Sequence, residues 1–238
     1  MQNTIPRYIA LHGSYNILQL AYCEGGECFA VIKQEDVRAS SHLITYLDSL
    51  LSQNEVTLQD LDFFVVDYGP GAFTSLRVTI AAVNGLGFAA RTRLIPVSGL
   101  DALLMQMLTV KSHESQVFVA LLNAYNNEVY YKISAPGFVL KQASLQEYGY
   151  SSIDSLIQML HQEFDQDITI LCAGNGANMH ASTLKTHFPL LQIQSDLLVP
   201  SIEHIAQLGF EQWMLGNPGV TRITPLYLKT QLFAVTQK

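Results

Sequence analysis

The chain has 238 residues, 49% of them hydrophobic and 14% charged, which is enough apolar material for one large or two small domains and excludes a disordered chain. Thirteen Lys and Arg against twenty Asp and Glu give a net charge of -7, so this chain is not expected to bind nucleic acid by itself through phosphate contacts. No basic leader and no apolar run of about 18 residues stands in the sequence. We therefore expect a cytoplasmic protein without membrane contact.

The first half predicts a strand hairpin, a helix, a buried strand and a glycine turn, followed by a long helix. The expected elements are strands at 8–11, up to Tyr22 and at 28–33, a helix at 40–54, a strand at 63–66 that stops at Gly69-Pro70-Gly71, and a helix at 73–90. Cys23, Cys28 and Cys172 are odd in number, which favours reduced thiols over a disulfide framework.

The second half repeats this order. The strand at 118–121 and the turn at 123–126 echo the strand at 8–11 and the turn at 13–16. A strand at 129–133, a helix that begins after Ser152 and a strand at 168–171 follow, and the last strand runs into Gly174-Asn175-Gly176. A plan that occurs twice predicts a duplicated α/β fold with two mixed sheets flanked by helices.

The helices at 40–54 and 73–90 carry more apolar side chains than one sheet covers. We predict that their second face binds a partner. The candidate interface residues are Leu43, Ile44, Leu47, Leu51, Leu76, Ile80 and Val83. Small residues would also let another helix approach closely, and these are Ala81, Ala82, Gly85 and Ala89. The alternative is that all these side chains face the protein's own sheet.

The chemistry-bearing residues do not assemble into a recognisable catalytic set. The turn at Gly69 and Gly71 could expose helix N–H groups to an anion, but no Lys stands where a Walker phosphate loop needs one. A GxGxxA pattern at Gly85 lies inside a predicted helix, which excludes a dinucleotide fingerprint. No two histidines stand four residues apart and no GxSxG occurs, so we expect no metal, no cofactor and no catalytic residue.

The segment Asp67-Tyr68-Gly69-Pro70-Gly71-Ala72-Phe73-Thr74-Ser75-Leu76-Arg77-Val78 resembles the GPGSFTGLRIG signature of the bacterial TsaB (YeaZ) family. Collinear similarities support it at Ser41-His42-Leu43, 96–100, 123–130, 174–177 and 225–228. The resemblance implies a duplicated actin-like ATPase (ribonuclease H-like) fold, with halves at 1–110 and 111–238 and a last helix, about 201–216, that packs back on the first half. A residual nucleotide cleft would then lie at the glycine turns Gly69, Gly71, Gly174 and Gly176.

The resemblance also implies a function. Members of this family are non-catalytic subunits in tRNA N6-threonylcarbamoyladenosine modification, and they bind and stabilise the catalytic subunit TsaD. It implies TsaE as an ATPase partner in a larger complex, a homodimer when the chain is alone, and only indirect contact with tRNA. His12 stands where most members retain an Asp, which argues against phosphoryl transfer. The alternatives are an active ATPase or small-molecule kinase of the actin-like superfamily, and a self-associating module.

Overall fold

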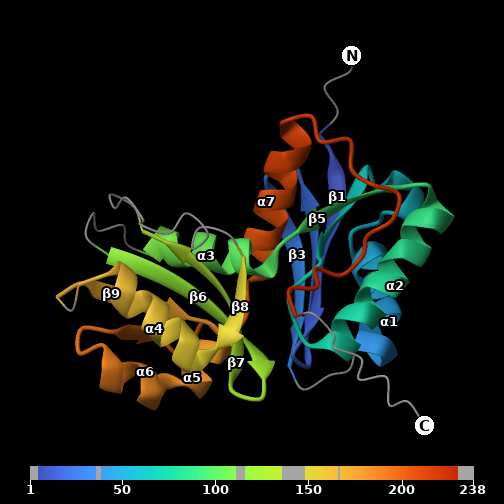
Figure 1. The fold of residues 1–238 in the computed structure, drawn as a ribbon. Helices are drawn as coiled ribbons and strands as arrows, with labels where there is room; N and C mark the ends of the chain where they lie inside the picture. Colours follow the sequence, from blue (N-terminus) through green and yellow to red (C-terminus); the bar gives the residue numbers. More distant parts are fainter. Residues whose placement is uncertain (1–4, 36–38, 111–115, 136–147, 166, 230–238) are drawn as a thin grey trace, which may run out of the picture.

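The protein, seen in a computed structural model, consists of two five-stranded mixed sheets in separate lobes, described over residues 5–35, 39–110, 116–135, 148–165 and 167–229 (Figure 1). The first sheet has the strand order β3-β2-β1-β4-β5 and the second has the order β10-β9-β6-β7-β8. In each, a hairpin pairs antiparallel and its first strand also pairs parallel with a later strand. The prediction of a duplicated plan with two mixed sheets is therefore confirmed.

Seven of the ten described strands lie close to the residues expected from the sequence, whereas β5, β8 and β10 were not expected. Those of the first sheet are β1 (Arg7–Ser14), β2 (Ile17–Glu24), β3 (Glu27–Gln34), β4 (Phe63–Asp67) and β5 (Arg93–Val97). Those of the second are β6 (Gln116–Tyr125), β7 (Glu128–Ser134), β8 (Gly149–Ser152), β9 (Thr169–Ala173) and β10 (Gln192–Gln194). All five residues of β4 are buried, because helices cover both faces of its sheet.

Helices cover both faces of each sheet. On the first sheet, α1 (Ala39–Gln53) and α2 (Phe73–Ala90) pack on one face and α7 (Ile202–Met214) on the other. On the second, α4 (Ile153–Glu163), α5 (Asn175–Met179) and α6 (Ala181–His187) pack on one face and α3 (Gly99–Val110) on the other. A short 3-10 turn, Leu58–Asp60, precedes β4.

Two helices are exchanged between the halves of the chain. The helix α7 follows the second sheet in sequence, yet Ile205 packs in one core with Tyr8 and Phe63 of the first sheet. Conversely, Leu103 of α3 packs with Phe118 of the second sheet. By packing, α3 therefore goes with the second sheet, although the expected boundary after residue 110 assigned it to the first half. Residues 111–115, which follow that boundary, lie outside the described residues.

Local sequence signals explain where helices begin. The Ser152 hydroxyl accepts a hydrogen bond from the Ser155 amide at the start of α4, and the Ser201 hydroxyl accepts one from the His204 amide at the start of α7. Both serines thus satisfy an amide that the first helical turn leaves without a partner.

The expectation of three reduced cysteines is wrong for two of them. The register of β2 and β3 places Cys23 directly opposite Cys28, and the structure joins the two in a disulfide. The strand pairing could not be read from the spacing of the cysteines alone. Cys172 is free and buried in β9.

Candidate functional site

The large apolar side chains of α1 and α2 turn inward. Six of the seven predicted interface residues lie in the protein's own core, which corrects the expectation that they form an outward face; the six are Leu43, Leu47, Leu51, Leu76, Ile80 and Val83. The reason is that branched side chains of these helices fill the space above the sheet, where they are removed from water. Only Ile44 of that set is exposed, with 57% of its surface accessible.

From Ala81 onward, the outward face of α2 is instead made of small residues that end in an aromatic one. Ala81, Gly85 and Ala89 are exposed, and Phe88 near the end of the helix is 86% exposed. A side-chain carbon added at Gly85 would meet nothing within 4 Å. The expectation that no run of about 18 residues is apolar enough to span a membrane is wrong for α2: among the described helices it has that length and composition, with 28% of its 18 residues buried. We call Ile44, Ala81, Gly85, Phe88 and Ala89 the open helix face.

The glycine turns serve the packing of the backbone. Gly69 has a φ of +109° and Gly174 a φ of +107°, conformations that residues with side chains rarely adopt. A side-chain carbon at Gly174 would lie 1.9 Å from the Leu121 carbonyl oxygen, and one at Gly71 would lie 2.4 Å from the Ser14 hydroxyl oxygen. At Gly176 the nearest atom, the Leu122 carbonyl carbon, would be 3.0 Å away. Gly69 and Gly174 therefore need glycine whether or not a ligand binds, whereas a side chain at Gly71 or Gly176 would require a shift of its neighbours.

Two amides at each of these turns donate to the protein itself. The Gly174 and Asn175 amides donate to the carbonyls of Leu197 and Leu198, each over 2.7 Å. The Gly69 amide donates to Asp67 Oδ1 over 2.9 Å, and the Ala72 amide donates to the Ser14 hydroxyl over 2.9 Å. An anion could bind these four amides only by displacing these bonds.

His12 stands at the position where an ATPase of this fold would need an acidic residue, and it forms a buried pair with Asp67. His12 Nδ1 lies 2.6 Å from Asp67 Oδ2, and both side chains are almost fully buried at neighbouring strand ends. His12 Nε2 has no hydrogen-bond partner among the described residues. Asp67 Oδ2 lies against the histidine and Oδ1 accepts from the Gly69 amide, so both oxygens already have a partner with which a magnesium ion would compete.

A second carboxylate near the junction of the lobes is also occupied. Lys132 Nζ and the Tyr148 hydroxyl both donate to Asp101 at the start of α3. Burial, followed by the hydrogen bond to Asp101, raises the pKa of Tyr148 well above its ordinary value. The Tyr15 hydroxyl donates to the Asn123 carbonyl over 2.8 Å, and this bond ties the first hairpin to the second. The Asp101 carboxylate and the Asn123 carbonyl at this junction therefore already accept hydrogen bonds from side chains of the protein itself.

A small aromatic cavity of about 230 Å³ lies between the start of α2 and the hairpin of β6 and β7. Its lining residues are Gly71, Phe73, Ala124, Tyr125, Tyr130, Tyr227 and Lys229. The hydrogen bond from Lys229 lowers the pKa of Glu128, and the same bond raises the pKa of Lys229. The one ammonium in this lining is thus already paired with a carboxylate. Within the described residues, no group of three or more His, Cys, Asp or Glu side chains is placed to hold a metal ion.

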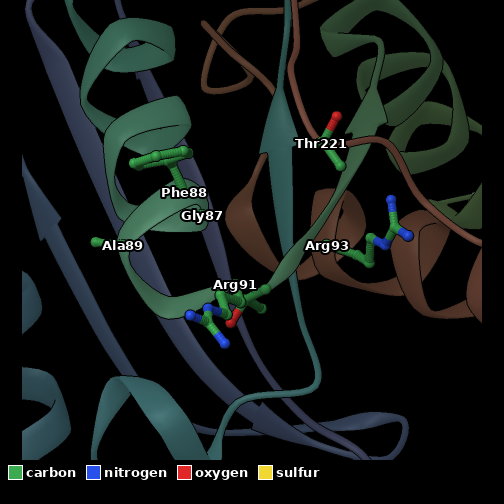
Figure 2. Close-up of a pocket in the computed structure, with 7 residues that line it drawn as sticks. Gly87, Phe88, Ala89, Arg91, Arg93 and Thr221 are labelled. Atoms are coloured by element: carbon green, nitrogen blue, oxygen red, sulfur yellow. The ribbon is translucent and has the colours of Figure 1, made fainter.

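A larger cavity, of about 630 Å³, opens at the far end of α2 (Figure 2). Figure 2 shows Phe88 on the last turn of the helix, Arg91 just beyond it, and Arg93 and Thr221 on neighbouring segments. The other lining residues are Gly87, Ala89 and Thr92. The sequence did not point to this cavity, because Thr221 reaches it from a segment more than a hundred residues away.

Comparison with protein families matches residues 37–205 to the family described as TsaD: tRNA N6-adenosine threonylcarbamoyltransferase. The chain belongs to this family. Within the family, the tRNA threonylcarbamoyladenosine biosynthesis protein TsaB of Haemophilus influenzae is 28% identical over 123 residues, which are 52% of this chain and 51% of that protein. The tRNA N6-adenosine threonylcarbamoyltransferase of Lawsonia intracellularis is 32% identical over 114 residues, 48% of this chain and 32% of that enzyme. The chain thus spans about half of the first relative and a third of the second.

Solved structures support the fold. A Pseudomonas aeruginosa protein described as similar to peptidase YEAZ superposes with a TM-score of 0.72 at 22% identity, covering 94% of this chain and 100% of the other. A Bacteroides thetaiotaomicron protein with an actin-like ATPase fold gives a TM-score of 0.51 at 10% identity, over 86% of this chain and 96% of the other. The resemblance to the TsaB (YeaZ) family and the predicted actin-like fold are both confirmed.

Proposed function

We propose that this protein is a non-catalytic subunit in the biosynthesis of tRNA N6-threonylcarbamoyladenosine, and that it binds and stabilises the catalytic subunit TsaD. One observation carries the proposal: the carboxylates near the junction of the lobes are occupied by the protein's own side chains, while an apolar helix face stays open. A surface of this kind serves association better than catalysis.

The occupied carboxylates support the non-catalytic part. Phosphoryl transfer relies on carboxylate-bound magnesium and on a cation at the phosphates. Here Asp67 is bonded to His12, and Asp101 to Lys132 and Tyr148. A magnesium ion would have to compete with these contacts at both carboxylates. The alternative of an active ATPase or small-molecule kinase is therefore disfavoured.

The open helix face supports the association part. Two helices pack at interaxial distances of about 8–10 Å, and small residues allow the short end of that range. Ala81, Gly85 and Ala89 recur at four-residue spacing along α2, so one side of the helix is flat and apolar. A helix of TsaD fits this side in the proposed complex. A homodimer through the same face when the chain is alone, TsaE in a larger complex, indirect contact with tRNA and a cytoplasmic location belong to the same proposal.

The affinity for TsaD of the same organism tests it. Ile44→Glu and Ala81→Glu place a carboxylate on the open helix face, where neither side chain supports the core, so both variants should stay folded and bind TsaD at least about tenfold more weakly. The matched control is Gln158→Glu on the exposed side of α4. ATP hydrolysis by the purified chain, lost on Asp67→Asn, would instead establish the ATPase alternative.

A further inference from the structure

The larger cavity has a rigid frame. Leu94 and Val220 exchange two backbone hydrogen bonds, which hold the segment after α7 against β5. The Asn84 side chain binds both the amide and the carbonyl of Ile223. A side-chain carbon at Gly87 would lie 2.8 Å from Leu94 Cδ2, so the last turn of α2 fits closely on the strand. The cavity is therefore a preformed feature of the fold.

The two chain segments that meet at this cavity carry positive charge only. Residues 68–100 and 212–238 hold six of the 13 Lys and Arg residues and none of the 20 Asp and Glu residues. Hydrogen bonds join the two segments beside the cavity. Among the described residues, Arg91, Arg93 and the exposed Arg222 have no carboxylate partner. A chain of net charge -7 thus gathers unpaired guanidinium groups at one place.

The donors available to an occupant are side chains. The amides of Arg91 and Thr92 donate to carbonyls of the last turn of α2, and the Leu94 amide donates to Val220. The helix presents its C-terminal end here, which disfavours a multiply charged anion held by backbone groups. The Thr221 hydroxyl and the two guanidiniums remain; Figure 2 shows the guanidiniums pointing to different sides, and each one alone offers a fork that matches a carboxylate well.

The second property of the cavity is the apolar side chain at its edge. Phe88 is 86% exposed and continues the open helix face directly into the cavity. An RNA backbone would use the guanidiniums but would leave Phe88 and the alanines of α2 in water. A protein segment that carries a carboxylate next to an apolar side chain would use both.

We propose that the cavity between Arg91 and Arg93 is the electrostatic end of the partner-binding surface and takes a carboxylate-bearing segment of the protein partner, whose apolar neighbour covers Phe88. This inference rests on the proposed function, since it assigns the chemistry of the partner's contact. The open helix face supplies apolar area, and the arginines fix the register and direction of the partner along α2.

Charge reversal tests the inference in the complex with TsaD. Arg91→Glu, Arg93→Glu and the double variant should each bind TsaD at least about tenfold more weakly, and the loss should shrink as salt is added. Phe88→Ala should also bind more weakly, with little dependence on salt. Lys185→Glu, which makes the same change of charge on the exposed side of α6, is the matched control and should bind like the wild type.

The outcomes separate the two proposals. If the wild type binds TsaD, Ile44→Glu does not, and the double arginine variant binds normally, the cavity inference is overturned and the proposed function stands. If the wild type does not bind TsaD, both fall. Saturable binding of inorganic phosphate to the isolated wild type that the double variant loses would reveal a small-anion site and overturn the inference. A double variant that binds TsaD normally while its complex loses tRNA affinity would reveal an RNA contact and overturn it as well.

Discussion

Substitutions at Gly85 should change the stability of the protein and its binding to TsaD independently of each other. It lies inside α2, faces solvent and has no atom within 4 Å of an added side-chain carbon, so Gly85→Ala removes no contact and causes no clash. Alanine in a helix interior is favoured over glycine by about 0.5–1 kcal/mol, because glycine loses more backbone freedom on folding. For a chain of this size, 1 kcal/mol moves the Tm by about 2–4 °C, so we expect a rise of about 1–4 °C.

Gly85→Arg should keep most of that gain, because arginine is also a good helix former. It should nevertheless weaken TsaD binding by at least about tenfold, since a long side chain on the flat side of α2 holds a partner helix away. Thermal unfolding and titration with TsaD measure the two effects on the same samples. The control is Gly216→Ala, which has equally open surroundings but a φ of +86°, so its Tm should fall. A lower Tm for Gly85→Ala would refute the conclusion that Gly85 faces open solvent. Unchanged TsaD affinity for Gly85→Arg would refute the assignment of this side of α2 to the TsaD interface.

Three further changes test the closed cleft and the lobes. Gly174→Ala forces a side-chain carbon toward the Leu121 carbonyl at a φ of +107°, so chemical denaturation should show a loss of at least about 2 kcal/mol, and a loss below 0.5 kcal/mol would contradict the geometry. His12→Leu leaves Asp67 buried without its partner and should lower the free energy of unfolding by about 3 kcal/mol. The double variant His12→Leu, Asp67→Asn should recover part of this loss. Equal stability of the single and double variants would count against an interaction between the two side chains. Burial lowers the pKa of His204 below 6.5, so on acidification the folded state binds this proton at a lower pH than the unfolded state does, and the free energy of unfolding falls as the pH drops below about 6.5. His204→Gln should flatten this part of the curve of stability against pH. An identical curve for the variant would show that another group is responsible.

The sequence predicted the elements well because their signals are local. Alternating and helical spacing of apolar residues located most strands and the helix at 73–90, and the repeated order indicated the duplication. Spacing also showed that Leu76, Ile80 and Val83 share one side of a helix, but it could not show which side meets the sheet. The sheet takes the branched side chains, and the small residues Ala81 and Gly85 are left outward.

The polar contacts of the site could not be predicted for a different reason. His12 and Asp67 are 55 residues apart, and Asp101 is 31 residues from Lys132 and 47 from Tyr148. Only the pairing of β1 with β4 and the placement of α3 on the second sheet bring these groups together. A histidine in place of an acidic residue was visible in the sequence, but the carboxylate that it would bind was not.

The exchange of α3 and α7 makes the two lobes dependent on each other for folding. A fragment that ended near residue 110 would lack the helix that shields Tyr8 and Phe63, and the complementary fragment would lack the one that shields Phe118. Each sheet would then expose a whole apolar face to water. The two lobes are thus not autonomous modules joined by a linker. Unfolding of either lobe would expose an apolar face of the other lobe's sheet to water.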